Sequence, residues 1–277
     1  MNALADRRDN FRGPLDPYGA VTHEVVNQPV ELVDTNLYDS DIALKGAVQR
    51  EGASWATDAL AAFGARAGSA EFLELGTLAN KNPPELDTHD RYGRRVDLIR
   101  FHPSYHALMK ASIEDGLHSS PWTDPGEGAH VARAARSYMQ TEVEAGHGCP
   151  ITMTFAATPC LKLQGDLAAQ WLPKIQARVY DPRNIPADEK RGLTIGMAMT
   201  EKQGGSDVRA NTTRALPLGT GGPAEPYELV GHKYFVSAPI GIARVVLART
   251  SEPPCFSVIA MPIVTPCFSS AGTLRGS

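Results

Sequence analysis

The stretch MTEKQGGSDVRANTTRA, residues 199–215, combines backbone and side chains that suit a bulky polar ligand. A Gly204-Gly205 step lets the backbone approach a ligand closely or adopt a positive φ angle. Directly after this step, Ser206 and Asp207 present a hydroxyl and a carboxylate. The stretch therefore predicts a ligand-binding turn, although it leaves the identity of the ligand open.

A second short stretch, GHKYFVS at residues 231–237, strengthens this interpretation. Each stretch alone is a weak signal, because a Gly-Gly pair is usually only a turn and HKYFVS has the composition of an ordinary half-buried strand. Together they are two strand-end motifs that can converge on one face of a sheet. We therefore predict that the two stretches lie side by side and share a ligand.

Other residue types that can do chemistry are present without the spacing that the chemistry needs. His102 and His106 are four positions apart, but a zinc protease pattern needs a Glu directly after the first His and a third ligand. The run GTGG at residues 219–222 resembles half of a dinucleotide fingerprint, yet it joins two strand-like runs, which predicts a hairpin loop. We expect neither a metal site nor a redox pair, because no C-x-x-C spacing or metal-ligand His spacing accompanies the cysteines Cys149, Cys160, Cys255 and Cys267.

Composition limits the classes of function that the chain can have. A hydrophobic content of 42% over 277 residues can fill the core of one large domain or two ordinary ones. With 27 Lys and Arg against 31 Asp and Glu, nucleic-acid binding would need a local basic patch. The one candidate patch, RYGRRVDLIR at 91–100, is interpreted as a solvated turn. Since no signal-peptide core or membrane-spanning run is found, we expect a cytoplasmic protein with no membrane partner.

The elements that must position these motifs change in type along the chain. Residues 1–36 are expected to be an N-terminal extension and 37–180 a helical domain, in which Ser69 caps a helix and Pro103 begins another. Residues 181–277 are expected to be a β-domain whose tail after about residue 252 is atypical. The predicted fold class is α+β, an all-helical domain followed by a small antiparallel sheet or barrel. Its strand-like runs are 193–201, 211–218, 227–238, 243–250 and 256–263.

The two motifs also carry a family resemblance. IGMAMTEKQGGSDVRANTTRA and LVGHKYFVSAP resemble the flavin-binding strands of the acyl-CoA dehydrogenase superfamily. Upstream segments resemble the branch of that superfamily linked to the DNA alkylation response, the AidB-like branch, with the similarity running from about Val26 to about Thr250. These segments are VNQPVELVDTNLYDSD, LELGTLANKNPPEL, IRFHPSYHALM, GAHVARAARSYM and CPITMTFAATP.

The resemblance implies that the ligand is FAD. In such a site Thr200 and Ser206 supply hydroxyls and backbone amides, and Phe235, Val236 and Ser237 stand at positions that hold a Trp-Ile-Thr-like triplet. An aromatic, an aliphatic and a hydroxyl side chain suit a flat ring that needs an apolar wall and a hydrogen-bond partner. The predicted cofactor-binding residues are Met197, Ala198, Met199, Thr200, Glu201, Lys202, Gln203, Gly204, Gly205, Ser206, Phe235, Val236 and Ser237.

The resemblance also implies what this chain lacks. Members of the family continue for a further, mostly helical half, which supplies a catalytic glutamate, the rest of the FAD site and most contacts of the homo-oligomer. The DNA-binding surface of the branch is implied to lie there as well. No catalytic residue is therefore assigned in this chain. We expect Glu201 to act as a strand-end hydrogen-bond acceptor or ion-pair partner rather than as the base.

The expected function is that of an FAD-dependent acyl-CoA oxidoreductase scaffold linked to the DNA alkylation response. The implied partners are an acyl-CoA substrate and double-stranded DNA, the latter through a region absent from this chain. Because the Pro/Ser/Gly-rich tail departs from the family pattern, we expect a truncated product with a frameshifted or misannotated end, in preference to a natural short variant. Whether it is an active enzyme stays open. The alternatives are a DNA-associated protective protein without significant turnover, and a truncated product without function.

Overall fold

The computed structural model describes residues 28–203, 205, 207–221, 226–234, 236, 243–250 and 256–262. The contacts between residues divide the chain after Leu32, and the architecture below concerns residues from Val33 onward. The expected division near residue 180 into a helical and a β-domain stays a prediction.

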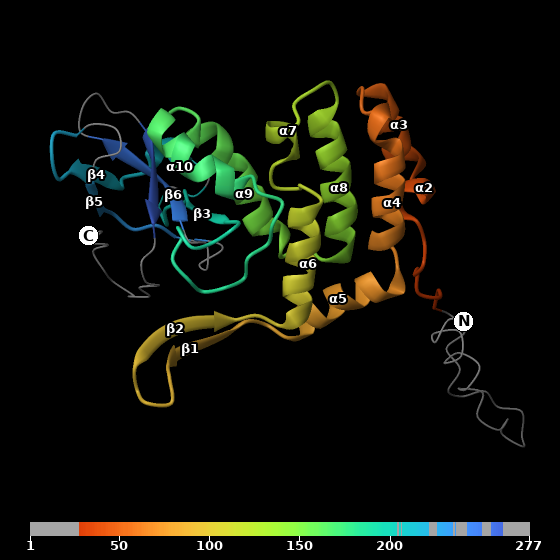
Figure 1. Ribbon diagram of the computed structural model, residues 1–277, viewed down its shortest axis with the longest axis horizontal. Coiled ribbons are helices and arrows are strands. Elements are labelled where there is room, and N and C mark those ends of the chain that lie inside the picture. Colours follow the sequence, from red (N-terminus) through yellow and green to blue (C-terminus); the bar gives the residue numbers. More distant parts are fainter. Residues whose placement is uncertain are drawn as a thin grey trace, which may run out of the picture. The chain divides into compact units, whose positions relative to one another are not determined.

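Helices account for the first part of this unit, as the sequence predicts (Figure 1). Ser69 is the N-cap of α5, where its Oγ accepts a hydrogen bond from Phe72 N, and Pro103 is the first residue of α6. The helical elements are α2 (Leu37–Ser40), α3 (Ile42–Arg50), η1 (Ser54–Ala56), α4 (Thr57–Ala67), α5 (Ala70–Lys81), α6 (Pro103–Glu114), α7 (Ser120–Thr123), α8 (Ala129–Val143), α9 (Gly148–Leu161) and α10 (Gly165–Ile175).

The largest hydrophobic core lies among the first of these helices. Helix α8 contributes a buried stripe at helical spacing, Ala132, Ala135, Met139 and Val143, and the small alanines let neighbouring helices approach closely. Figure 1 shows α8 beside α6, with α4 and α3 on its other side. None of the helices within the described residues is long and apolar enough to cross a membrane.

Two glycines inside helices are expected to respond to alanine in opposite directions. An alanine Cβ at Gly76 in α5 would collide with Val143 O at the end of α8, so Gly76→Ala should cost about 1–3 kcal/mol. At Gly46 in α3 no atom lies within 4 Å of the added Cβ, so Gly46→Ala should gain about 0.5–1 kcal/mol from helix propensity. Denaturant unfolding of the two variants measures both signs, and a gain of stability at Gly76 would contradict this close contact between α5 and α8.

A two-stranded hairpin interrupts the helices, which corrects the sequence interpretation of a helical pattern throughout this region. Strands β1 (Glu85–His89) and β2 (Arg95–Arg100) pair antiparallel and join α5 to α6 as an extension away from the helices (Figure 1). The turn between them is closed by Asp90, whose Oδ1 accepts from the backbone N–H groups of Tyr92 and Arg94. The turn predicted in this segment is therefore confirmed, but as the tip of a small sheet.

The arginines of the hairpin do not form a basic patch. Arg95 Nε lies 2.7 Å from Asp97 Oδ2, and Arg100 pairs with Asp87 on the opposite strand. Over residues 85–100, Arg91, Arg94, Arg95 and Arg100 are matched in number by Glu85, Asp87, Asp90 and Asp97. The hairpin therefore carries no excess positive charge for a phosphate backbone.

The second part is a small sheet, which confirms the predicted fold class. Its strands are β3 (Ile195–Ala198), β4 (Arg214–Pro217), β5 (Tyr227–Val230), β6 (Ala243–Thr250) and β7 (Phe256–Pro262), in the order β3-β6-β4-β5 with β7 paired to β6. The pairs β4–β5 and β6–β7 are antiparallel, as expected of strands that neighbour each other in sequence. The loop that contains GTGG thus joins the two strands of a hairpin, as predicted.

Two pairings are parallel, which the expectation of an antiparallel sheet did not include. Strand β3 pairs with the first half of β6, and β4 pairs with its last two residues. Between β3 and β6 the chain passes through β4 and β5. In the described part of this connection the chain forms strands and the short helix η2 (Val208–Ala210), with no α-helix. The sheet is therefore mixed, and its described residues contain no βαβ unit of the kind found in nucleotide-binding domains.

Helices α9 and α10 hold β3 in place. Ala157, Leu161, Trp171 and Ile175 from the helices form one core with Leu193 and Ile195. Thr154 Oγ1 accepts a hydrogen bond of 2.9 Å from Ile195 N and donates one of 2.7 Å to Pro150 O. Because β3 leads directly into the ligand-binding turn predicted from the sequence, this packing fixes where the turn begins.

Candidate functional site

Glu201, three residues after the end of β3, is the centre of a dense hydrogen-bond cluster. Its side chain is 1% exposed. Oε2 accepts from Thr212 N at 2.6 Å and from Thr212 Oγ1 at 2.9 Å, and Gln203 Nε2 also donates to it. Oε1 accepts from Thr213 N at 2.8 Å and from Lys233 Nζ at 3.1 Å. The carboxylate thus ties three separate pieces of chain together.

These donors keep Glu201 ionised. Burial alone would raise the pKa of the carboxyl, but the hydrogen bonds from Thr212, Thr213 and Lys233 outweigh burial and hold the pKa well below its usual range. A carboxylate that already accepts this many hydrogen bonds is a poor proton acceptor. The expectation that Glu201 is a hydrogen-bond acceptor and ion-pair partner is therefore confirmed.

The two motifs predicted to converge do lie side by side. Tyr234 N donates to Thr200 O at 3.0 Å, and Glu201 and Lys233 form an antiparallel bridge. Lys233 Nζ also donates to Met199 O at 3.0 Å, where Asn211 Nδ2 makes a second hydrogen bond of 2.6 Å. The carboxylate and the lysine are almost fully buried, so the two segments are joined by contacts that water does not screen.

The predicted site residues divide into an inner and an outer group. Ala198 is buried against Ala215 and Leu229, with Val236 packed on the same cluster, and Glu201 points into the network described above. The outer group consists of half-buried Thr200 and of four exposed residues, Met199, Lys202, Gln203 and Gly205. Met197 is half-buried and its N–H faces Met153 Sδ. Gly204, Ser206, Phe235 and Ser237 lie outside the described residues.

The outer group offers groups that could contact a flat ligand with polar edges. Met199 offers an apolar surface that is 43% exposed, and the Thr200 hydroxyl makes no hydrogen bond within the described part of the chain. Gly205 adopts φ +50°, as the glycine pair predicts, and a Cβ built there would meet no atom within 4 Å. An apolar surface, a hydroxyl and an open stretch of backbone fit a flat ring that has polar edges.

Sequence reasoning missed a second buried polar cluster, formed where α8 ends and α9 begins. Glu144 Oε2 lies 2.8 Å from both His147 N and His147 Nδ1, and Glu144 Oε1 accepts from Gly146 N. On the other side of the ring, His147 Nε2 lies 3.0 Å from Ser112 Oγ and 3.1 Å from Gln140 Nε2. The Glu-x-x-His spacing between two helices was the signal that could have revealed it.

The hydrogen bonds of this cluster keep the Glu144 carboxylate ionised. The hydrogen bond from the His147 side chain lowers the pKa of Glu144 to about 2, against the opposing effect of burial and with help from the backbone N–H groups of Gly146 and His147. With Nδ1–H donated to Glu144, Nε2 accepts from Ser112 and Gln140. The cluster therefore joins α6, α8 and α9.

The paired histidines seen in the sequence do not act together. His102 caps α6, where its Nδ1 accepts from Ser104 N, whereas His106 Nδ1 lies 2.7 Å from Tyr180 Oη. In the described part of the chain, no group of three or more His, Cys, Asp or Glu side chains is arranged to hold a metal ion.

Comparison with known proteins identifies the family to which this architecture belongs. The model of the adaptive response protein AidB N-terminal domain matches residues 27–182, more than half of the chain. The putative acyl-CoA dehydrogenase AidB of Escherichia coli (strain K12) is 53% identical over 232 residues, which are 83% of this chain and 42% of that protein. Acyl-CoA dehydrogenase family member 11 of Caenorhabditis elegans is 29% identical over 198 residues, 69% of this chain and 30% of that protein.

Solved structures show the same arrangement. The apo form of Bd2924 superposes with a TM-score of 0.69 at 29% identity, over 83% of this chain and 46% of that one. Caenorhabditis elegans ACDH-11 in complex with C11-CoA superposes with a TM-score of 0.65 at 25% identity, over 86% of this chain and 40% of that one. The chain thus spans less than half the length of each of these relatives. The chain belongs to the AidB N-terminal-domain family and has an acyl-CoA dehydrogenase-like scaffold.

Proposed function

We propose that residues 197–206 and 235–237 form one wall of an FAD site in an acyl-CoA oxidoreductase scaffold. The observation that carries this proposal is the convergence of the two motifs through Glu201, Lys233 and the Tyr234–Thr200 hydrogen bond. The convergence places exposed Met199 and half-buried Thr200 beside the second motif, because Met199 O accepts from Lys233 Nζ and Thr200 O accepts from Tyr234 N. The C11-CoA complex of the relative ACDH-11 supports an acyl-CoA as the substrate class.

When bound, FAD would supply the acceptor for a hydride from the substrate. The residues of this chain hold and orient the ring. Thr200 provides a hydroxyl for a polar edge of the ring, Met199 an apolar contact, and the backbone around Gly205 a close approach without a side chain. Glu201 and Gln203 already use their side chains within the protein, so we propose that they contribute backbone groups and shape rather than side-chain contacts.

Retention of flavin by the purified chain tests the proposal. We expect FAD to remain bound after excess is removed, with a visible absorbance band, and Thr200→Val to weaken FAD affinity about tenfold through loss of one hydrogen bond. Thr77→Val is the matched control, because the Thr77 hydroxyl bonds only to Leu73 O on an exposed part of α5. Equal affinities of the two variants, or a folded protein that retains no flavin, would contradict the proposed site.

We further propose that this scaffold acts in the cytoplasm, in the DNA alkylation response. Membership of the AidB family supports this role, and the balanced charges of the 85–100 hairpin give no DNA-binding surface there. The role of the described residues is therefore proposed to lie in the flavin site, with DNA contacts and most homo-oligomer contacts belonging to the part of the relatives that this chain does not span. Salt-dependent binding of duplex DNA by the isolated chain would contradict that division.

A further inference from the structure

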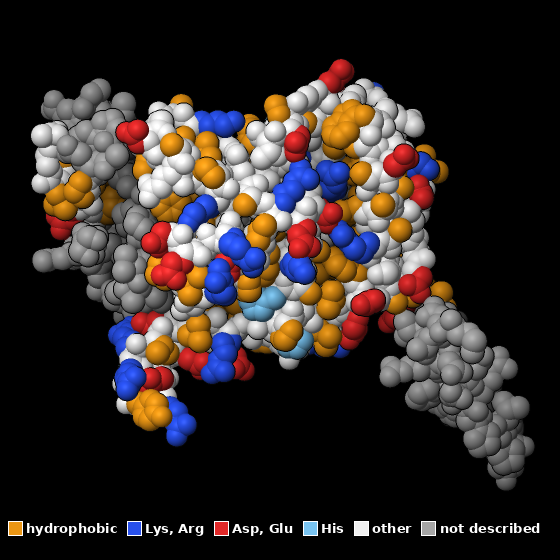
Figure 2. Space-filling model, in the orientation of Figure 1, with side chains coloured by type: hydrophobic (Ala, Val, Ile, Leu, Met, Phe, Trp, Pro, Cys, Tyr) orange, Lys and Arg blue, Asp and Glu red, His pale blue; other side chains and the backbone are white. Residues whose placement is uncertain are grey.

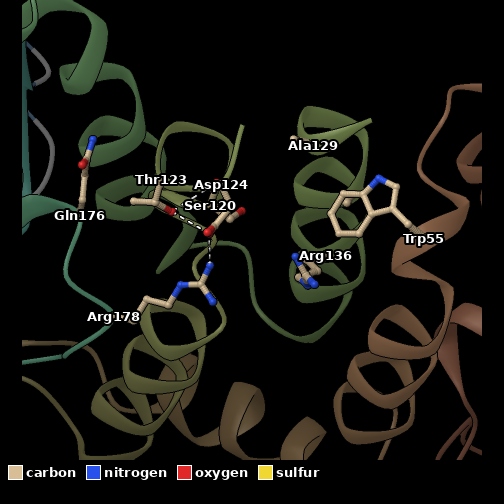
Figure 3. A pocket seen from close by; sticks show the side chains of 9 residues that line it. Trp55, Ser120, Thr123, Asp124, Ala129, Arg136, Gln176 and Arg178 are labelled. Atoms are coloured by element: carbon tan, nitrogen blue, oxygen red, sulfur yellow. Dashed lines mark hydrogen bonds and ion pairs between the residues drawn. The ribbon is translucent and has the colours of Figure 1, made fainter. Parts of the chain in front are cut away.

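A cavity of about 470 Å³ lies among the helices, apart from the proposed flavin site. Helix α7, the first half of α8, the short helix η1 and the segment after α10 contribute to it (Figure 3). Its volume falls within the range of small-molecule binding sites. The polar side chains that line it are Ser120, Thr123, Asp124, Arg136, Gln176 and Arg178, and Trp55 forms part of its wall.

The cavity carries a net positive charge. Arg178 Nη2 lies 2.8 Å from Asp124 Oδ2, so these two charges largely cancel. Arg136 is half-buried and makes no hydrogen bond or ion pair within the described residues. The carboxylate that acts on Arg136 through charge, Asp115, is itself paired with Arg66. One guanidinium group is thus left to face the cavity with unused donors.

The surroundings of Arg136 favour an anion as the occupant. Burial lowers the pKa of Arg136, but an arginine stays charged in proteins, and a half-buried unpaired charge is costly. The cavity also reaches Ala129 in the first turn of α8, where the helix dipole favours negative charge. On the side of the molecule that Figure 2 draws, Lys and Arg side chains are mixed with Asp and Glu over the middle.

Trp55 gives the cavity an aromatic wall. Its indole Nε1 donates to Glu127 O at 2.9 Å, which fixes the ring, while 64% of the residue is exposed. In Figure 3 the ring extends towards the cavity from the side opposite Thr123 and Asp124, with Arg136 between the two sides. A ligand that lies between them would contact an indole ring at one end and a guanidinium group at the other.

We propose that this cavity binds a small organic phosphate with a planar ring, of which a nucleoside monophosphate is the simplest representative. The phosphate pairs with Arg136 and accepts from the Ser120 hydroxyl, and the ring lies against Trp55. This site is separate from the proposed flavin site, because none of the residues that line it belongs to the 197–206 or 231–237 segments.

Calorimetric titration of the 277-residue chain with AMP tests the proposal. We expect saturable 1:1 binding that Arg136→Gln weakens at least tenfold and that Asp124→Asn strengthens, since the second change removes the negative charge beside Arg178. Arg50→Gln, the same substitution at an exposed site on α3, is the matched control and should leave AMP affinity unchanged. Circular dichroism melts check that each variant is folded.

Two further ligands test separately the contact of the ring with Trp55 and the contact of the phosphate with Arg136. Adenosine and inorganic phosphate should each bind at least tenfold more weakly than AMP, and Trp55→Ala should reduce AMP affinity towards that of phosphate. Phosphate binding as tight as AMP binding would overturn the role assigned to Trp55, and AMP binding unaffected by Arg136→Gln would overturn the site. Because AMP is a part of FAD, the effect of Arg136→Gln on FAD affinity serves as a cross-check: FAD affinity should be unchanged, whereas a loss parallel to that of AMP would mean that AMP occupies the flavin site.

Discussion

Replacing Glu201 with alanine is expected to destabilise the protein by about 3–5 kcal/mol, which lowers the melting temperature by roughly 10 °C. The reason is that the substitution leaves Lys233 as an almost buried, unpaired charge and removes the acceptor of Thr212 N and Thr213 N. Thermal melts followed by circular dichroism measure the loss. Flavin binding should fall with it, because the same carboxylate holds the two motifs together.

Two further variants make this result specific. Lys202→Ala removes an exposed side chain from the neighbouring position and should change stability by less than 0.5 kcal/mol. Glu201→Gln keeps the shape but loses the charge opposite Lys233, so its stability should lie between the wild type and Glu201→Ala. If Glu201→Ala melted like Lys202→Ala, the carboxylate would not hold this part of the sheet.

The second large effect is expected at Glu144. Replacing it with glutamine should cost roughly 3 kcal/mol at pH 7, from the lowered pKa and the lost hydrogen bonds to His147. The pKa of about 2 in the folded protein lies below the value of 4.5 expected for an unperturbed Glu. The stabilisation is therefore fully present above about pH 5 and is lost as the pH falls towards 2.

Urea unfolding at several pH values tests this dependence. The difference in unfolding free energy between wild type and Glu144→Gln should shrink as the pH falls from 5 to 3. Glu74→Gln, at an exposed position of α5, should show a small difference that does not vary in this way. A Glu144→Gln difference that stayed constant over this range would mean that the carboxylate has an ordinary pKa.

Local signals in the sequence were enough to predict most elements. Ser69 and Pro103 mark helix starts because capping and a fixed φ angle are properties of single residues. The strand-like runs after residue 193 were recognisable from β-branched and aromatic residues, and all of the observed strands of the larger sheet fall within them. The convergence of the two motifs followed from their positions at strand ends.

What the sequence did not show depends on contacts between distant residues. The 85–100 hairpin was missed because its strands are polar and mostly exposed, so no buried face produces an alternating pattern. The parallel pairings of β6 with β3 and β4 join strands that are distant in sequence, and local propensity does not encode such pairings. The cavity at Arg136 brings together side chains from four separate segments, each of them unremarkable alone.

The inner group of the predicted site illustrates the same limit. The residue type of Glu201 was read correctly as a structural acceptor, but its partners Thr212, Thr213 and Lys233 become visible only when the turn closes. The sequence therefore predicted which segments meet, whereas the division into supporting and exposed residues required their geometry.

Hydrogen–deuterium exchange with and without FAD tests the central claim most directly. If residues 197–206 and 235–237 form one wall of the flavin site, FAD should slow exchange in peptides from both segments, while the 85–100 hairpin and α3 stay unchanged. Slower exchange in only one of the two segments, or FAD binding without protection in either, would contradict the account.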